Sequence, residues 1–175
     1  MKRLIVLLIS FYSFAVSASS LVTGYPFTFC DHDVSGPHED YYVEFMKDGT
    51  EFEAQMYLSP SKKPCGGDLL FSIGRTWSYE VSGGELTSVL KEVVVLISHP
   101  RIIPLFNKHK FCDHSDWKVD SIVKCTGKNI FEYESLAGHR TIHQFRFLGN
   151  ELHFIDDSGE KLILRKMVSP VVPFR

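Results

Sequence analysis

The chain of 175 residues is 44% hydrophobic, 13% aromatic and 23% charged, a composition typical of a folded globular domain and not of a disordered chain. Domains usually contain about 100–200 residues, so the length accommodates one domain. The 19 basic and 21 acidic residues give a formal net charge of -2. Because this balance offers no positive field for a phosphate backbone, a nucleic-acid partner is not expected.

The first residues have the pattern of a secretory signal peptide. Two basic residues precede an apolar stretch from Leu4 to Val16, which is followed by small residues through Ala18. This order is typical of a cleaved signal, and the stretch is shorter than the roughly 20 residues of a membrane-spanning helix. We expect residues 1–18 to be removed and residues 19–175 to form one domain, secreted or periplasmic and not an integral membrane protein. An uncleaved anchor is the alternative.

An even number of cysteines in an exported chain predicts two disulfides. Three pairings are possible, and the pairing of near neighbours closes the shorter loops, which we expect. The expected bonds are therefore Cys30–Cys65 and Cys112–Cys125. A zinc site is the alternative, because Cys-Asp-His occurs at both Cys30 and Cys112. Structural zinc sites usually contain closely spaced cysteine pairs, which are absent here, so no metal and no cofactor is expected.

Short segments of alternating or continuous apolar character, closed by Gly, Pro, Asn or Asp, predict strands. Segments 41–47 and 51–58 flank Asp48-Gly49 and predict a hairpin, with Phe52, Ala54, Met56 and Leu58 on one face. In chain order, further strands are expected over 68–73, 75–81, 86–98, 117–124, 129–134, 141–148, 151–155 and 161–166. A break at Gly74 separates the first two of these, and a single helical turn, limited by Pro104, is expected within residues 100–110.

Nine or ten strands with at most one short helix predict an all-β fold, an antiparallel barrel or half-barrel. Closure is favoured because it removes exposed sheet edges. A barrel of this size either packs its inward side chains as a core or encloses an apolar ligand. The alternation places aromatic and branched residues on shared faces, and we expect these to bind the ligand: Tyr41, Val43, Phe45, Trp77, Tyr79, Phe145 and Phe147.

Catalytic motifs are missing from the sequence. It contains no His-Glu-x-x-His, Gly-x-Ser-x-Gly or glycine-rich phosphate loop. His139 and His143 have helical spacing but fall at the start of a predicted strand, and Asp156-Asp157 is explained by turn chemistry. We therefore expect a protein that is not an enzyme.

A resemblance covers residues 24 to 175. Its features are Cys30, followed by the aromatic-rich strand Tyr41 to Phe45 and by Cys65; the segment Leu69 to Trp77; Leu105-Phe106-Asn107-x4-Cys112-x4-Trp117; Thr126-Gly127; and Gly149-Asn150-Glu151-Leu152. This pattern resembles the secreted domain of the adenomatosis polyposis coli down-regulated protein family. The resemblance implies a lipocalin-like half-barrel with a hydrophobic cavity that binds a lipid or fatty acyl chain, without catalysis.

Two functional hypotheses follow from the sequence. The first is an exported, non-catalytic binding protein that holds an apolar small molecule or lipid in its barrel. The alternative is a secreted or periplasmic protein-interaction module, similar to an inhibitor, that binds a protein partner through the loops at 30–37 or 60–67. This alternative requires a filled barrel core.

Overall fold

A computed structural model describes residues 23, 26–31, 38–63, 66–126, 137–155, 159 and 161–166. The predicted signal peptide, the predicted strand 129–134 and Cys65 lie outside these residues. The described elements, in chain order, are β1 (Pro26–Asp31), β2 (His38–Phe45), β3 (Thr50–Leu58), β4 (Leu69–Ser82), β5 (Glu85–Ile97), the 3-10 turn η1 (Pro100–Ile102), α2 (Ile103–His109), the 3-10 turn η2 (Phe111–Asp113), β6 (Ile122–Lys124), β7 (Arg140–Leu148), β8 (Glu151–Ile155) and β9 (Lys161–Lys166).

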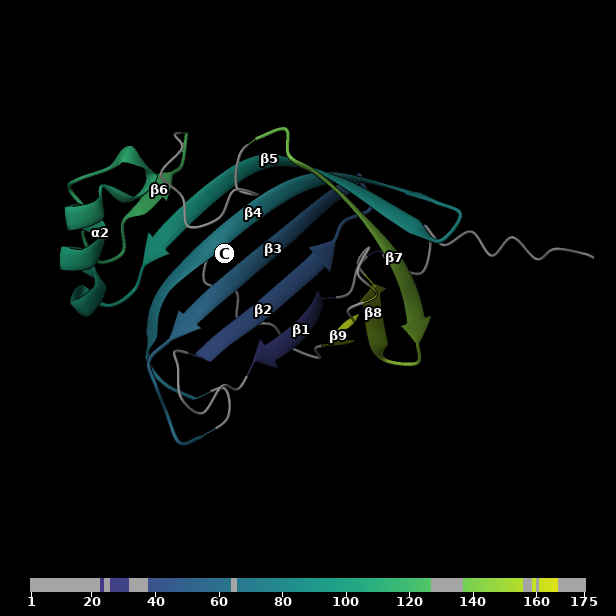
Figure 1. Cartoon of the computed structure of the whole chain (residues 1–175), viewed down its shortest axis with the longest axis horizontal. Coiled ribbons are helices and arrows are strands. Elements are labelled where there is room, and N and C mark those ends of the chain that lie inside the picture. Colours follow the sequence, from purple (N-terminus) through teal and green to yellow (C-terminus); the bar gives the residue numbers. More distant parts are fainter. Residues whose placement is uncertain are drawn as a thin grey trace, which may run out of the picture.

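Eight antiparallel strands form a closed barrel. Their order is β4-β3-β2-β1-β9-β8-β7-β5, and a pairing between β4 and β5 closes the circle. Besides β4, the long strand β5 pairs with two further strands, with β7 through residues 85–89 and with β6 through residues 94–96. Figure 1 shows β1 to β5 side by side as a strongly curved sheet, with α2 and β6 at one end. The predicted all-β antiparallel barrel with one short α-helix is confirmed for the described part of the chain.

Three details of the predicted elements are wrong. β4 continues without a break through Gly74, which is paired with Ala54 on one side and Val94 on the other. Ladder hydrogen bonds to two neighbours thus override the weak strand preference of glycine. Strand β1 was not among the predicted strands. The strand expected over 117–124 is reduced to β6, because Trp117 packs into the cluster around α2 and residues 118–121 form a turn, in which Asp120 has a φ of 62° and the Ser121 hydroxyl donates to the carbonyl of Lys118.

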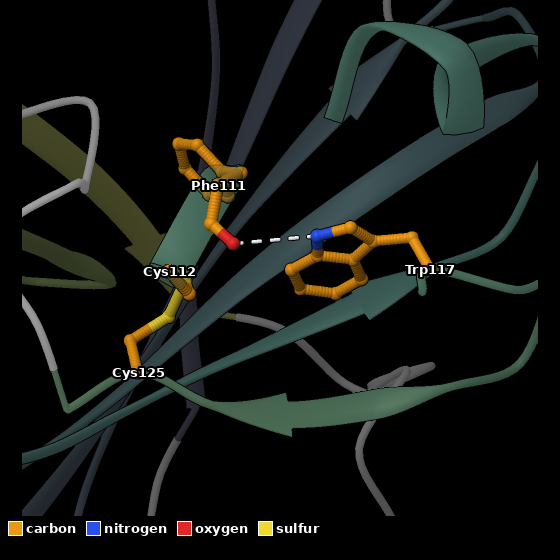
Figure 2. The surroundings of a disulfide bond; sticks show 4 residues. All are labelled: Phe111, Cys112, Trp117 and Cys125. Carbon is orange, nitrogen blue, oxygen red and sulfur yellow. Dashed lines mark hydrogen bonds between the residues drawn. A yellow bond between two sulfur atoms is a disulfide. The ribbon is translucent and has the colours of Figure 1, made fainter. Parts of the chain in front are cut away.

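The segment around α2 covers one end of the barrel. Its buried side chains Phe106, Phe111 and Trp117 join a core cluster with residues of β4 and β5. Trp117 is 2% exposed, and its indole Nε1 donates to the carbonyl of Phe111 at 3.3 Å (Figure 2). The segment is therefore a packed cap.

A disulfide fastens this cap to the residue after β6. Cys112 and Cys125 are bonded to each other (Figure 2), which confirms one of the two predicted pairs. Cys30 is also in a disulfide. Its pairing with Cys65, which lies outside the described residues, stays a prediction. The oxidised cysteines are compatible with a secreted or periplasmic protein.

A second apolar cluster occupies the interior on the side of β1, β2 and β7 to β9. Its buried members are Phe27, Val43, Phe45, Leu86, Phe145, Leu152 and Leu164. The barrel therefore has two separate packed regions, and its remaining interior is available for other side chains or a ligand.

Candidate functional site

A cavity of about 530 Å³ lies inside the barrel. This volume falls within the range of about 300–1,000 Å³ that is common for small-molecule sites. Every one of the eight barrel strands contributes to its wall. The apolar lining residues are Phe29, Val43, Leu86, Phe154, Leu162 and Leu164, and Trp77 and Tyr41 add aromatic surface.

Most of the charged side chains of the wall come from β3 and β4, and polar residues of β5, β7 and β9 complete its polar part. In the β2–β3 hairpin, Glu51 lies opposite Phe45 and Glu53 lies opposite Val43. Residues directly opposite each other in an antiparallel pair point to the same face of the sheet. The carboxyl groups are therefore directed to the interior together with the apolar side chains of β2. On β4, the residue opposite Glu53 is Arg75.

Arg75 is the centre of a buried hydrogen-bond network. The residue is 5% exposed, and its Nη1 lies 2.9 Å from Oε1 of Glu53. Both terminal nitrogens also donate to Oε1 of Gln55 at 3.1 Å. The indole Nε1 of Trp77 donates to the second oxygen of Glu53 at 3.2 Å. Glu53 thus has a hydrogen bond on each oxygen, and it offsets the charge of Arg75.

Gln55 connects this ion pair to a second carboxyl group. Its amide Nε2 donates to Oε2 of Glu39 at 3.0 Å and to the hydroxyl of Tyr41 at 2.7 Å. The Tyr41 hydroxyl in turn donates to Glu39 at 2.8 Å. Burial, together with the Glu39 hydrogen bond and charge, raises the pKa of Tyr41. The phenol therefore stays protonated and acts as a donor at physiological pH.

Glu51 is held differently from Glu53. It is 7% exposed, and its Oε2 receives a hydrogen bond from the Ser88 hydroxyl at 2.7 Å. Burial raises the pKa of Glu51 to about 8; the Ser88 bond opposes this shift, and the charge of Glu53 adds to it. Glu51 is thus mainly a neutral carboxylic acid at pH 7.

The seven predicted ligand-binding residues divide into two groups. Tyr41, Val43 and Trp77 line the cavity. The other four, Phe45, Tyr79, Phe145 and Phe147, lie in the second apolar cluster or pack against it. Within it, Phe45 meets Tyr79 edge to face at 5.3 Å, and Phe145 meets Phe147 at 5.9 Å. Val43 belongs both to the cavity wall and to this cluster, whereas the other four residues belong to the packing beside the cavity and do not line it.

The sequence analysis did not identify the polar residues of the wall: Glu51, Glu53, Gln55, Arg75 and Ser88. It noted only the other face of β3, which contains Phe52, Ala54 and Met56. The register of the Asp48-Gly49 hairpin was the available signal, since it places Glu53 opposite Val43 and Glu51 opposite Phe45.

Within the described part of the chain, no group of three or more His, Cys, Asp or Glu residues is arranged to hold a metal ion. Cys112, which the zinc alternative would use as a thiolate, is in a disulfide. The described residues also form no helix that is long and apolar enough to cross a membrane.

Comparison with known proteins finds no family model that matches this sequence and no curated protein with significant similarity to it. The resemblance to the adenomatosis polyposis coli down-regulated family thus stays a prediction. The functional conclusion depends on the barrel and its cavity.

Proposed function

We propose that this protein is an exported, non-catalytic binding protein that holds one small ligand with an apolar body in its barrel. The observation that carries the proposal is the cavity of about 530 Å³, in whose wall eight aromatic and aliphatic residues stand beside eight polar or charged ones. Pockets that bind small molecules combine apolar surface with polar groups that orient the ligand. A lipid or a molecule with a fatty acyl chain fits the apolar part of this wall.

The cavity favours this function over a protein-interaction module. That alternative requires a barrel filled by its own side chains, with activity in the loops. Part of each loop, residues 32–37 and 64–65, lies outside the described residues. The argument for a ligand therefore rests on the barrel interior alone.

A pair of matched variants tests the proposal. Thr141 lines the cavity from β7, so Thr141→Trp places a large side chain in the ligand volume. Thr87 precedes the inward residue Ser88 on β5 and faces the outer side, so Thr87→Trp adds the same bulk outside the cavity. The probe is N-phenyl-1-naphthylamine, a neutral apolar dye, titrated into protein from which bound molecules have been extracted.

We expect wild-type protein and the Thr87 variant to bind one dye molecule per chain, and the Thr141 variant to bind at least about tenfold more weakly. Circular dichroism and melting curves verify that each variant is folded. Wild-type protein that fails to bind the dye would overturn the proposal, as would unchanged binding by a folded Thr141 variant.

A further inference from the structure

The part of the cavity wall around Glu51 is rich in carboxyl groups. Glu51 and Glu53 line it, and Glu39 joins the hydrogen-bond network of Glu53. The basic residues of the wall are Arg75, which is paired with Glu53 and bonded to Gln55, and Lys161 at an exposed position of β9. An anionic head group next to Glu51 would therefore meet two carboxyl groups and a guanidinium that is already paired.

Glu51 is the carboxyl group that is available to a ligand. Both oxygens of Glu53 accept hydrogen bonds, from Arg75 and Trp77. Glu51 has one bond, from Ser88 to Oε2, and no other described residue bonds to it. The residue is 7% exposed and lines the cavity. Among the described side-chain atoms only Ser72 Oγ is both fully buried and without a partner, so the second oxygen of Glu51 can be reached from the cavity and can accept a hydrogen bond from a ligand.

An aromatic ring stands next to this carboxyl group. Trp77 lies directly opposite Glu51 in the β3–β4 pair, and such pairs have Cβ atoms about 4.5–5.5 Å apart. Both residues line the cavity. A carboxylate beside an indole attracts an organic cation, because the negative face of the ring adds to the charge.

We propose that Glu51 and Trp77 form the head-group end of the cavity and that the ligand carries a protonated amine on an apolar body. This inference rests on the proposed function and specifies its ligand class. The apolar lining from β1, β8 and β9 would hold the body, and the ammonium would donate to the free oxygen of Glu51.

The groups that face Glu51 determine how amine binding depends on pH. They are Glu53 on the same strand, Arg75 and Tyr79 on β4, His143 on β7 and Lys161 on β9. Arg75 is neutralised by Glu53. Burial raises the pKa of Tyr79, so its hydroxyl stays neutral. His143 and Lys161 come from other strands of the wall, and the cationic Lys161 would disfavour an ammonium close to it.

Amine binding should release a proton from Glu51. Its pKa of about 8 means that the acid must ionise to pair with an ammonium, which itself stays charged to about pH 10. Affinity for an amine should therefore rise by up to about 50-fold between pH 6 and pH 8. A neutral ligand of the same shape should show no such rise.

The test measures displacement of N-phenyl-1-naphthylamine by three ligands that share one alkyl chain: octylamine, octanol and octanoate. The variant Glu51→Gln keeps the shape of the side chain and the acceptor for Ser88 but removes the charge. Glu80→Gln makes the same change at an exposed position of β4 and is the matched control.

We expect octylamine to displace the dye best at pH 8, and octanoate to displace it least. Glu51→Gln should weaken octylamine by at least about tenfold and leave octanol unchanged, whereas Glu80→Gln should change neither. The rise in octylamine affinity with pH is a second measurement that needs no variant. Equal displacement by octylamine and octanol, or an amine preference that survives in Glu51→Gln, would overturn the amine inference alone. Failure of the dye to bind would overturn the proposed function and this inference with it.

Discussion

The variant Glu51→Gln should change how the stability of the protein depends on pH. The pKa of Glu51 is about 8 in the folded protein against 4.5 for an exposed glutamate. Between pH 4.5 and about pH 8, Glu51 is therefore protonated in the folded state and ionised in the unfolded state. Stability conferred by the protonated carboxyl group is complete below pH 4.5 and declines as the pH rises towards 8. Glutamine, which does not titrate, removes this decline.

The size of this change in stability follows from the difference between the pKa values of Glu51 in the folded and unfolded states. Each pH unit within the window costs up to about 1.4 kcal/mol, so the folded wild-type protein should lose about 3 kcal/mol from this group by pH 7. Relative to wild type, the free energy of unfolding of Glu51→Gln should therefore increase by about 2–3 kcal/mol between pH 5 and pH 7. The Ser88 hydrogen bond can be kept, because the glutamine carbonyl also accepts.

Urea unfolding, followed by tryptophan fluorescence at pH 5, 6, 7 and 8, measures this difference. Titrations of other residues are common to variant and wild type and cancel in the comparison. The exposed control Glu80→Gln should differ from wild type by the same amount at every pH. If Glu51→Gln also showed a constant difference, Glu51 would titrate like an exposed glutamate, and the buried cavity wall described above would be wrong.

Three further variants test the packing around the site by urea unfolding. Replacing Cys112 and Cys125 by serine opens a loop with a sequence separation of 13 and should cost about 3 kcal/mol; an unchanged midpoint under oxidising conditions would refute this. Arg75→Met leaves the half-buried carboxylate of Glu53 without its positive partner and should cost about 3 kcal/mol. Lys118→Met, in an exposed ion pair, should cost less than about 1 kcal/mol, and equal losses would contradict the network. Trp117→Ala should cost about 3–5 kcal/mol, and a loss below about 1 kcal/mol would show that the cap is not packed as described.

The strand content and the barrel could be predicted because alternation, turn residues and the absence of helical periodicity agree along the chain. The Cys112–Cys125 bond followed from proximity in sequence. Gly74 shows the limit of local reasoning, since its strand conformation depends on neighbours on both sides.

The wall of the cavity was predictable only in part. Tyr41 and Val43 were found because alternating apolar residues mark an inward face. Glu53 and Arg75 were missed because single-strand patterns assign charged residues to the solvent side. Their inward position depends on the pairing register, which places Val43, Glu53 and Arg75 in one row across three strands. Applying the hairpin register to β3 would have identified Glu53, but Arg75 required knowledge of a pairing across a long loop.

Native mass spectrometry, in the presence of N-phenyl-1-naphthylamine, counts the ligands in the barrel of the mature protein. Wild-type protein and Thr87→Trp should each carry one dye molecule per chain, and Thr141→Trp, with its cavity filled, should carry none. A wild-type spectrum without any adduct, or an adduct that persists in a folded Thr141→Trp protein, would contradict a ligand site inside this barrel.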